Sequence, residues 1–121
     1  MSIIDVHTHA FTDTLAPVAI PALMAAADLD EGVTPHYDGT IAGLIAVMDR
    51  AGVDRSVIAP VATKPSQVRT INDWAMSLVS DRLIPFGAMH PDFPDPAAEL
   101  ARLAEGGVRG IKMHSQNQDF A

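Results

Sequence analysis

Apolar and polar positions along this chain follow two periods, one typical of buried strands and one typical of amphipathic helices. Short runs of β-branched and apolar residues predict four strands, over residues 3–9, 56–61, 83–89 and 108–114. The last three begin at nearly equal intervals, with a helical pattern between neighbours. This spacing is typical of βα units, in which a helical crossover joins adjacent parallel strands. We therefore expect the four strands to lie in sequential order, with helices covering one face.

The helical period is clearest between the first two predicted strands. Asp38 or Thr40 is the expected N-cap of this helix, and Gly52 is its expected end. Four apolar side chains recur there at intervals of three and four positions, as on one face of a helix: Ile41, Leu44, Ile45 and Met48.

A helix is also expected after each of the next two strands. The later one begins with Asp95 as its N-cap and Pro96 in its first turn, and it points Leu100 and Leu103 inward. The glycine pair at 106–107 should end it. The earlier helix covers residues 65–80, and its inner face should carry Val68, Ile71, Ala75, Leu78 and Val79.

The long segment between the first strand and residue 38 contains three prolines and an apolar middle. It predicts one short helix near residues 22–29, with acidic residues and Gly32 at its exit. As the loop after the first strand, this segment should lie over the carboxyl end of the sheet.

The length of the chain limits what these elements can form. It has 121 residues, whereas a complete (β/α)8 barrel typically needs about 250. We therefore predict an α/β fold of parallel βα units that forms the N-terminal half of a TIM barrel, with residues 1–121 as one partial domain. A hydrophobic content of 48% with 19% charged residues is typical of globular proteins.

Charge and composition narrow the expected partners. The net charge of −7 and the scattered basic residues argue against binding to nucleic acid. No apolar run approaches the about 20 residues that a membrane span requires. The first residues lack the basic and apolar regions of a signal peptide, and the chain has no cysteine. We therefore expect a cytoplasmic protein.

The first predicted strand ends in two histidines one residue apart. Side chains alternate between the faces of a strand, so His7 and His9 point the same way and both imidazoles can reach one metal ion. Because the chain has five histidines, such a pair can also arise by chance, and the pair alone is weak evidence. Its place at the carboxyl end of a parallel strand, where α/β folds carry their chemistry, favours metal ligation. Asp5 lies on the same face and is expected to accept a hydrogen bond from a histidine.

Three further side chains at strand ends are candidates for contacts with a substrate. His90 follows the third strand, and Lys112 and His114 share one face of the fourth. Lys112 has three possible roles: binding an anionic substrate, pairing with an acid such as Asp5, or bridging two metal ions after carbamylation. The polar run at 116–118 is expected in a loop.

Five segments, in this order along the chain, resemble the amidohydrolase-related family, a branch of the amidohydrolase superfamily of metal-dependent TIM barrels. The resemblance covers nearly all of these residues. It implies that His7 and His9 ligate a divalent ion, usually zinc. Ser115 departs from the pattern, because the family's Lys-x-His run usually continues with proline. The segments are IIDVHTH at 3–9, YDGT at 37–40, MDRAGVD at 48–54, PVATKP at 60–65 and GVRGIKMH at 107–114.

This resemblance implies a hydrolase in which a metal-activated water attacks an amide, ester or lactone, with a small-molecule substrate as the expected partner. Some relatives decarboxylate aromatic or unsaturated acids instead, and the histidine pair does not choose between these reactions. The family's other ligands are a histidine ending strand five, often one on strand six, and an aspartate after strand eight that is also the general base. None of these lies within four strands.

A rival interpretation from outside the enzymes is a non-catalytic half barrel or an interaction module. With two histidines as ligands, we expect weak metal occupancy and little hydrolysis from these 121 residues alone. The first and fourth strands would be open edges, and an apolar face would be uncovered. We therefore expect the chain to form a homo-oligomer.

Overall fold

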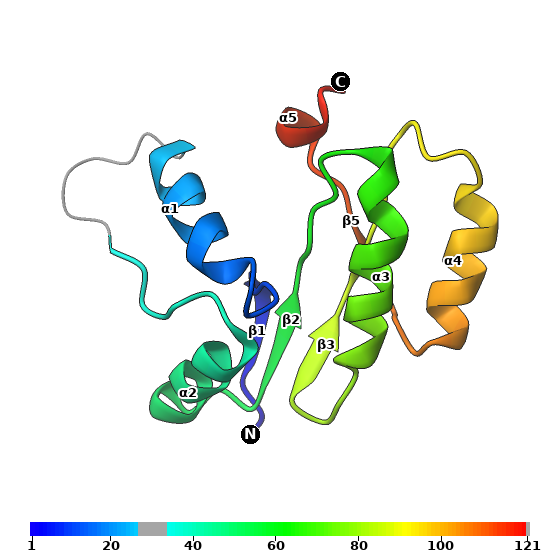
Figure 1. Cartoon of the computed structure of the whole chain (residues 1–121). Helices are drawn as coiled ribbons and strands as arrows, with labels where there is room; N and C mark the ends of the chain where they lie inside the picture. Colours follow the sequence, from blue (N-terminus) through cyan, green and yellow to red (C-terminus); the bar gives the residue numbers. More distant parts are fainter. Residues whose placement is uncertain (27–33, 121) are drawn as a thin grey trace.

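The computed structural model describes residues 1–26 and 34–120, in which strands and helices alternate along the chain (Figure 1). All of the strand pairs in this part of the chain are parallel. The fold is therefore mixed α/β with parallel strands, as the sequence pattern predicts. The elements are β1 (Ile4–Thr8), α1 (Ala16–Ala26), α2 (Ile41–Ala51), β2 (Arg55–Ile58), the 3-10 helix η1 (Pro65–Gln67), α3 (Val68–Ser77), β3 (Leu83–Pro85), β4 (Gly87–Ala88), α4 (Pro96–Glu105), β5 (Ile111–Lys112) and α5 (Ser115–Gln118).

The third predicted strand, over 83–89, is divided into β3 and β4. β2 lies between β1 and β3 in a three-stranded sheet, whereas β4 pairs with β5 in a separate two-stranded sheet. Phe86 is the junction, because its N–H donates to the carbonyl of Ile58 at 2.9 Å while the N–H of Gly87 donates to Gly110 at 2.8 Å. The predicted sequential order is confirmed, but the expected single four-stranded sheet is wrong. The half barrel stays a prediction.

The boundaries of α2 follow from its flanking residues, as the sequence predicts. The Thr40 hydroxyl accepts a hydrogen bond from the Gly43 N–H at 2.9 Å, which makes Thr40 the N-cap. Asp38 supports it, because its carboxylate accepts from both the N–H and the hydroxyl of Thr40, and these bonds lower the pKa of the Asp38 carboxyl. Gly52 ends the helix with a φ of +69°, a conformation that favours glycine.

Two clusters of buried side chains hold the helices against the strands. The first lies between α2 and strands β2 and β3, and the second between α3 and the ends of β4 and β5. Both place helix side chains of the expected period against the sheet, which is the source of most of the stability of such short helices. The buried members are Ala10, Leu44, Met48, Ile58 and Leu83 in the first cluster, and Ala62, Val68, Ala88 and Met89 in the second.

Several predicted helix positions are wrong. The helix expected over 65–80 is a 3-10 turn followed by α3, which ends at Ser77, so Val79 lies beyond it and is 45% exposed. In α4, Leu103 is buried as expected, but Leu100 is 42% exposed, because it lies with Leu103 and Ile111 at an open hollow beside β5.

The short helix expected near residues 22–29 begins earlier than predicted. α1 starts at Ala16, because Pro17 falls in the first turn, where a helix has no use for the missing N–H. Pro21 lies inside α1, where its missing N–H removes a helical hydrogen bond. Residues 27–29 and the acidic exit of the predicted helix lie outside the described residues.

β1 is an open edge of the sheet, as the sequence predicts. Among the described strands it pairs with β2 alone. Its outward side chains have no helix over them, since Ile4 is 46% exposed and Val6 is 75% exposed. An edge strand with exposed β-branched side chains is a surface on which another strand can add.

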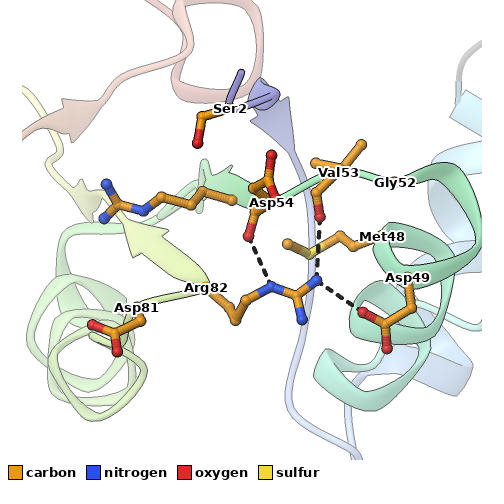
Figure 2. A pocket seen from close by; sticks show the side chains of 9 residues that line it. Ser2, Met48, Asp49, Gly52, Val53, Asp54, Asp81 and Arg82 are labelled. Atoms are coloured by element: carbon orange, nitrogen blue, oxygen red, sulfur yellow. Dashed lines mark hydrogen bonds and ion pairs between the residues drawn. The ribbon is translucent and has the colours of Figure 1, made fainter.

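A cavity of about 530 Å³ with a charged lining lies at the amino ends of β1, β2 and β3. Figure 2 shows the Arg82 guanidinium between Asp49 and the backbone of residues 53 and 54. It donates to the Asp49 carboxylate at 2.9 Å and to the carbonyls of Asp54 and Val53 at 2.8 and 3.2 Å. Arg82 therefore ties the start of β3 to the end of α2, which is a structural role.

No helix among the described residues has the length and apolar character to span a membrane.

Candidate functional site

A cavity of about 260 Å³ lies at the carboxyl ends of β1 and β5. His7 and His9 reach it from the end of β1, and Lys112 and His114 reach it from the end of β5. Figure 1 shows α1 and α5 at this end of the strands, opposite the N-terminus. The structure thus brings together four of the five residues expected from the sequence. The remaining lining residues are Phe11, Leu23, Val61, Thr63 and Asn117.

The two histidines of β1 lie against each other at one side of this cavity. Their ring centroids are 4.9 Å apart, with an angle of 63° between the rings. The Nδ1 atom of His9 lies 2.9 Å from the carbonyl oxygen of Ala59. Because a carbonyl only accepts hydrogen bonds, Nδ1 carries the proton and Nε2 keeps a free lone pair. This arrangement is common in histidines that bind metals, since the bond to Nδ1 fixes the ring.

Neighbouring segments hold the backbone of His9 in place. The Tyr37 hydroxyl, from the loop before α2, donates a hydrogen bond to the His9 carbonyl. The Thr8 hydroxyl donates to the Val57 carbonyl at 2.7 Å and joins β1 to β2. Burial raises the pKa of the Tyr37 hydroxyl, so it remains a donor at neutral pH. No periodic pattern in the sequence indicates this role of Tyr37, because the residue lies in a loop and contacts the end of a distant strand.

The environment of His9 keeps its ring neutral. Partial burial lowers its pKa from the usual 6.5, and the positive charges of His7, Lys112 and His114 add to this effect. The hydrogen bond to Ala59 acts in the opposite direction but is outweighed. A metal ion requires the neutral imidazole, so His9 is available as a ligand at lower pH than an ordinary histidine.

His114 and His90 have the opposite proton arrangement from His9. The Nδ1 atom of His114 accepts a hydrogen bond from the Asn117 N–H at 3.3 Å. In the same way, Nδ1 of His90 accepts from the Asp92 N–H at 3.2 Å. In a neutral ring the proton is then on Nε2, which makes each of these side chains a hydrogen-bond donor rather than a ready metal ligand. His90 is buried and does not line the cavity of the other four residues.

The segment after His114 is a short helix and not the loop expected from the sequence. The predicted strand over 108–114 is reduced to Ile111–Lys112, and α5 follows. Gln118 is buried, and its side-chain amide donates to the carbonyls of Ala62 at 2.7 Å and Met89 at 2.6 Å. Its side-chain oxygen accepts from the His114 N–H at 2.8 Å. Gln118 therefore joins the ends of three strands and positions His114.

Lys112 and Asp5 differ in part from what the sequence suggested. Lys112 lines the cavity but forms no ion pair with Asp5 or with any other described carboxylate, so the suggested pairing is not present there. The Asp5 carboxylate accepts from the backbone N–H of His7 at 3.0 Å, rather than from a histidine ring as expected. The Asp5 carboxylate braces the backbone of β1 where its register with β2 is irregular, and Lys112 remains available to an anionic ligand.

The donor atoms fit a zinc ion in part. Imidazole nitrogens are common zinc ligands, and Nε2 of His9 is free beside His7. However, the described residues contain no group of three or more His, Cys, Asp or Glu side chains that could hold a metal ion. Zinc in proteins is usually tetrahedral, with four ligands, so the histidine pair would supply two of the four.

Comparison with known protein families and with curated proteins gives no match for this chain. Among solved structures, the chain is similar to the crystal structure of a probable 2-pyrone-4,6-dicarboxylic acid hydrolase from Acinetobacter baumannii with citric acid bound. The TM-score is 0.49 and the sequence identity 19%, over 93% of this chain. The chain spans 38% of the length of that protein. The family that the sequence motifs resemble therefore stays a prediction.

Proposed function

We propose that this chain forms part of a metal-dependent hydrolase that acts on an amide, ester or lactone of a small molecule. One observation carries the proposal: His9, fixed through Nδ1, presents a free Nε2 beside His7 in a cavity that also contains Lys112 and His114. Two nitrogen ligands, a cation and a hydrogen-bond donor thus meet at the carboxyl ends of parallel strands. This is where α/β folds carry their active sites.

Each of the four side chains has a separate role in this proposal. His7 and His9 hold the divalent ion, for which zinc is our proposal. Such an ion, when bound, supplies a nucleophilic water near neutral pH and polarises the carbonyl of the substrate. Lys112 binds a negatively charged group of the substrate, and His114 donates a hydrogen bond from Nε2 to a substrate oxygen. Tyr37 and Gln118 act through the backbone, as positioning residues for His9 and His114.

Binding of Co²⁺ tests the proposal, because the absorption spectrum of this ion reports its ligands and it replaces zinc in such sites. His9→Ala should weaken Co²⁺ binding by about tenfold or more, since it removes a ligand. His114→Ala should leave it nearly unchanged, because its proton arrangement makes it a donor. The control is His36→Ala, an exposed histidine outside the cavity.

A second measurement distinguishes a catalytic from a structural metal site. A catalytic site keeps an open position on the ion, whereas a structural site is closed by protein ligands. Acetohydroxamate, which chelates through two oxygens, should therefore change the Co²⁺ spectrum of the wild-type chain. An unchanged spectrum, or equal Co²⁺ affinity in the wild type and His9→Ala, would contradict the proposal.

A further inference from the structure

A second cavity, of about 370 Å³, lies beside the histidine site and is enclosed by three segments. Residues 9–15 after β1 form one wall, and residues 59–63 after β2 form another. The third wall is η1 and the first two turns of α3, which contribute Gln67, Thr70, Ile71 and Trp74. In Figure 1 the chain after β2 runs upward between α1 and α3, so these walls meet at the carboxyl end of the sheet.

The lining of this cavity is uncharged and mainly apolar. Among the described residues that line it, His9 alone is titratable. The polar groups of Thr63 and Gln67 bind each other, since the Thr63 N–H and hydroxyl lie 2.9 and 3.0 Å from the Gln67 side-chain oxygen. The lining therefore offers a charged group no opposite charge to offset the loss of its hydration. The apolar members of the lining are Ala10, Phe11, Leu15, Ala59, Pro60, Val61, Ile71 and Trp74.

This apolar cavity and the histidine cavity share part of their walls. His9, Phe11, Val61 and Thr63 line both. His9 thus has the polar cavity, with Lys112 and His114, on one side and the apolar cavity on the other. One ligand can therefore place an apolar group in the second cavity while its carbonyl lies next to the imidazole of His9.

We propose that the apolar cavity binds the hydrocarbon arm of the substrate, so that the substrate is an amide, ester or lactone with an aromatic or branched alkyl substituent. An apolar cavity of about 150 Å³ is enough to hold benzene, so this cavity has room for a phenyl ring and a short linker. Burial of such a ring is favourable by about 25 cal/mol for each Å² removed from water. This inference rests on the proposed hydrolase function for the carbonyl, but the binding of the arm does not require the metal.

Trp74 allows the inference to be tested directly, because it lines the cavity and is the single tryptophan of the chain. Its fluorescence is measured in metal-free protein during titration with 2-phenylacetamide, and with acetamide, which lacks the ring. We expect a saturable change in the Trp74 emission with 2-phenylacetamide and none with acetamide at the same concentrations. No saturable change with 2-phenylacetamide would overturn the inference.

Substitutions that fill the cavity locate the binding. Thr70→Phe and Thr12→Phe introduce a ring from opposite walls, and both positions are exposed, so the fold should tolerate them. Each should weaken binding of 2-phenylacetamide by about tenfold or more, since the added ring occupies the same space. The matched control is Ser66→Phe, an exposed hydroxyl residue of η1 that does not line the cavity, and it should change the affinity less than about twofold. Equal affinity in all three variants would show that the probe binds elsewhere and would overturn the inference.

The two proposals fail in different ways. If Co²⁺ binds through His9 but 2-phenylacetamide does not perturb Trp74, the hydrolase proposal stands and the proposed binding of a hydrocarbon arm in the apolar cavity is wrong. If 2-phenylacetamide binds and the filling variants abolish it while His9→Ala leaves Co²⁺ binding unchanged, the apolar arm stands as a binding subsite and the metal-dependent chemistry is wrong.

Discussion

The side chain of Asn72 in α3 forms two hydrogen bonds with the backbone of Ala88 in β4, in the way that a neighbouring strand would. Its side-chain oxygen accepts from the Ala88 N–H at 2.7 Å, and its amide nitrogen donates to the Ala88 carbonyl at 3.1 Å. The same nitrogen donates to the carboxylate of Glu99 at 2.8 Å. Asn72 is fully buried and Glu99 nearly so. One amide therefore ties α3, β4 and α4 together beneath the carboxyl end of the sheet.

Substitution of Asn72 by alanine should strongly destabilise the chain. It leaves the buried N–H and carbonyl of Ala88 without the side-chain partner that Asn72 supplies, and each unsatisfied group costs about 1–3 kcal/mol. The Glu99 carboxylate loses one donor but keeps its bonds to Arg102. We expect Asn72→Ala to lower the free energy of unfolding in urea by about 3 kcal/mol. The control Thr70→Ala, an exposed change on the same helix, should stay within about 0.5 kcal/mol of the wild type. Equal unfolding midpoints for the two variants would contradict this.

The sequence predicts those parts of the fold that depend on local signals. The caps at Thr40 and Asp95 are correct, and so is the buried face with Leu44 and Met48. These features follow from residues a few positions apart. The change of partner at Phe86 depends on where β2 and β5 lie in space, and no pattern within residues 83–89 records it.

The candidate site shows the same division. Strand parity places His7 with His9 and Lys112 with His114, and the structure gathers all four at one cavity. The sequence predicts His90 at the same site because it follows a predicted strand. The chain turns at residues 91–92, where the ring of His90 accepts a hydrogen bond from the Asp92 N–H, and His90 does not line the cavity.

Contacts between distant segments are the other part that the sequence did not predict. Tyr37 binds the carbonyl of His9 from 28 positions away, and Gln118 reaches Ala62 across 56 positions. A tyrosine in a loop and a glutamine in a polar run have no periodicity from which such contacts could be read. Their geometry appears once the strands are assembled.

The ring of His9 should titrate below pH 6.5, because burial and nearby positive charges lower its pKa. The imidazole C–H resonances measured by NMR across the pH range report the midpoint. Lys112→Met removes one of the positive charges and should raise the midpoint towards 6.5. The control is Lys64→Met, the other lysine of the chain, which does not line the cavity. A His9 midpoint at or above 6.5 in the wild type would contradict this.

The same shift in the pKa of His9 makes stability depend on pH. The unfolded chain binds a proton near pH 6.5, whereas the folded chain binds it at lower pH. The contribution of His9 to stability is therefore complete above pH 6.5 and is lost as the pH falls from there towards the folded pKa. Urea unfolding at several pH values should show that the free energy of unfolding falls less over this pH range in His9→Ala than in the wild type.

The open edge at β1 leads us to expect self-association of this chain. Val6 is 75% exposed on an unpaired edge strand, and a lysine there should oppose the addition of a second strand. Light scattering should give a mass that rises with concentration for the wild type and less so for Val6→Lys. Val18→Lys, at a valine 66% exposed on α1, is the matched control and should behave as the wild type. A wild-type monomer at all concentrations that does not bind the dye ANS would exclude this expectation.

The last prediction concerns how much metal the chain retains. His7 and His9 offer two nitrogen ligands, and the described residues contain no group of three or more candidate ligands. We expect elemental analysis after dialysis to find zinc well below one ion per chain in the wild type and none in the His7→Ala/His9→Ala double variant. Neither imidazole belongs to the buried core, so their removal should leave the fold intact and a loss of zinc can be assigned to the ligands.

The stoichiometry also identifies what completes the site. Equal zinc in the wild type and the double variant would show that the histidine pair is not the site. One zinc ion per chain that is lost only in the double variant would mean that further ligands come from outside the chain's own described residues. If Val6→Lys, which opposes association at β1, then lowered the zinc content together with the measured mass, a second copy of the chain would be their source. If it lowered the mass alone, water or buffer molecules would complete the coordination, because the ion would not depend on the partner.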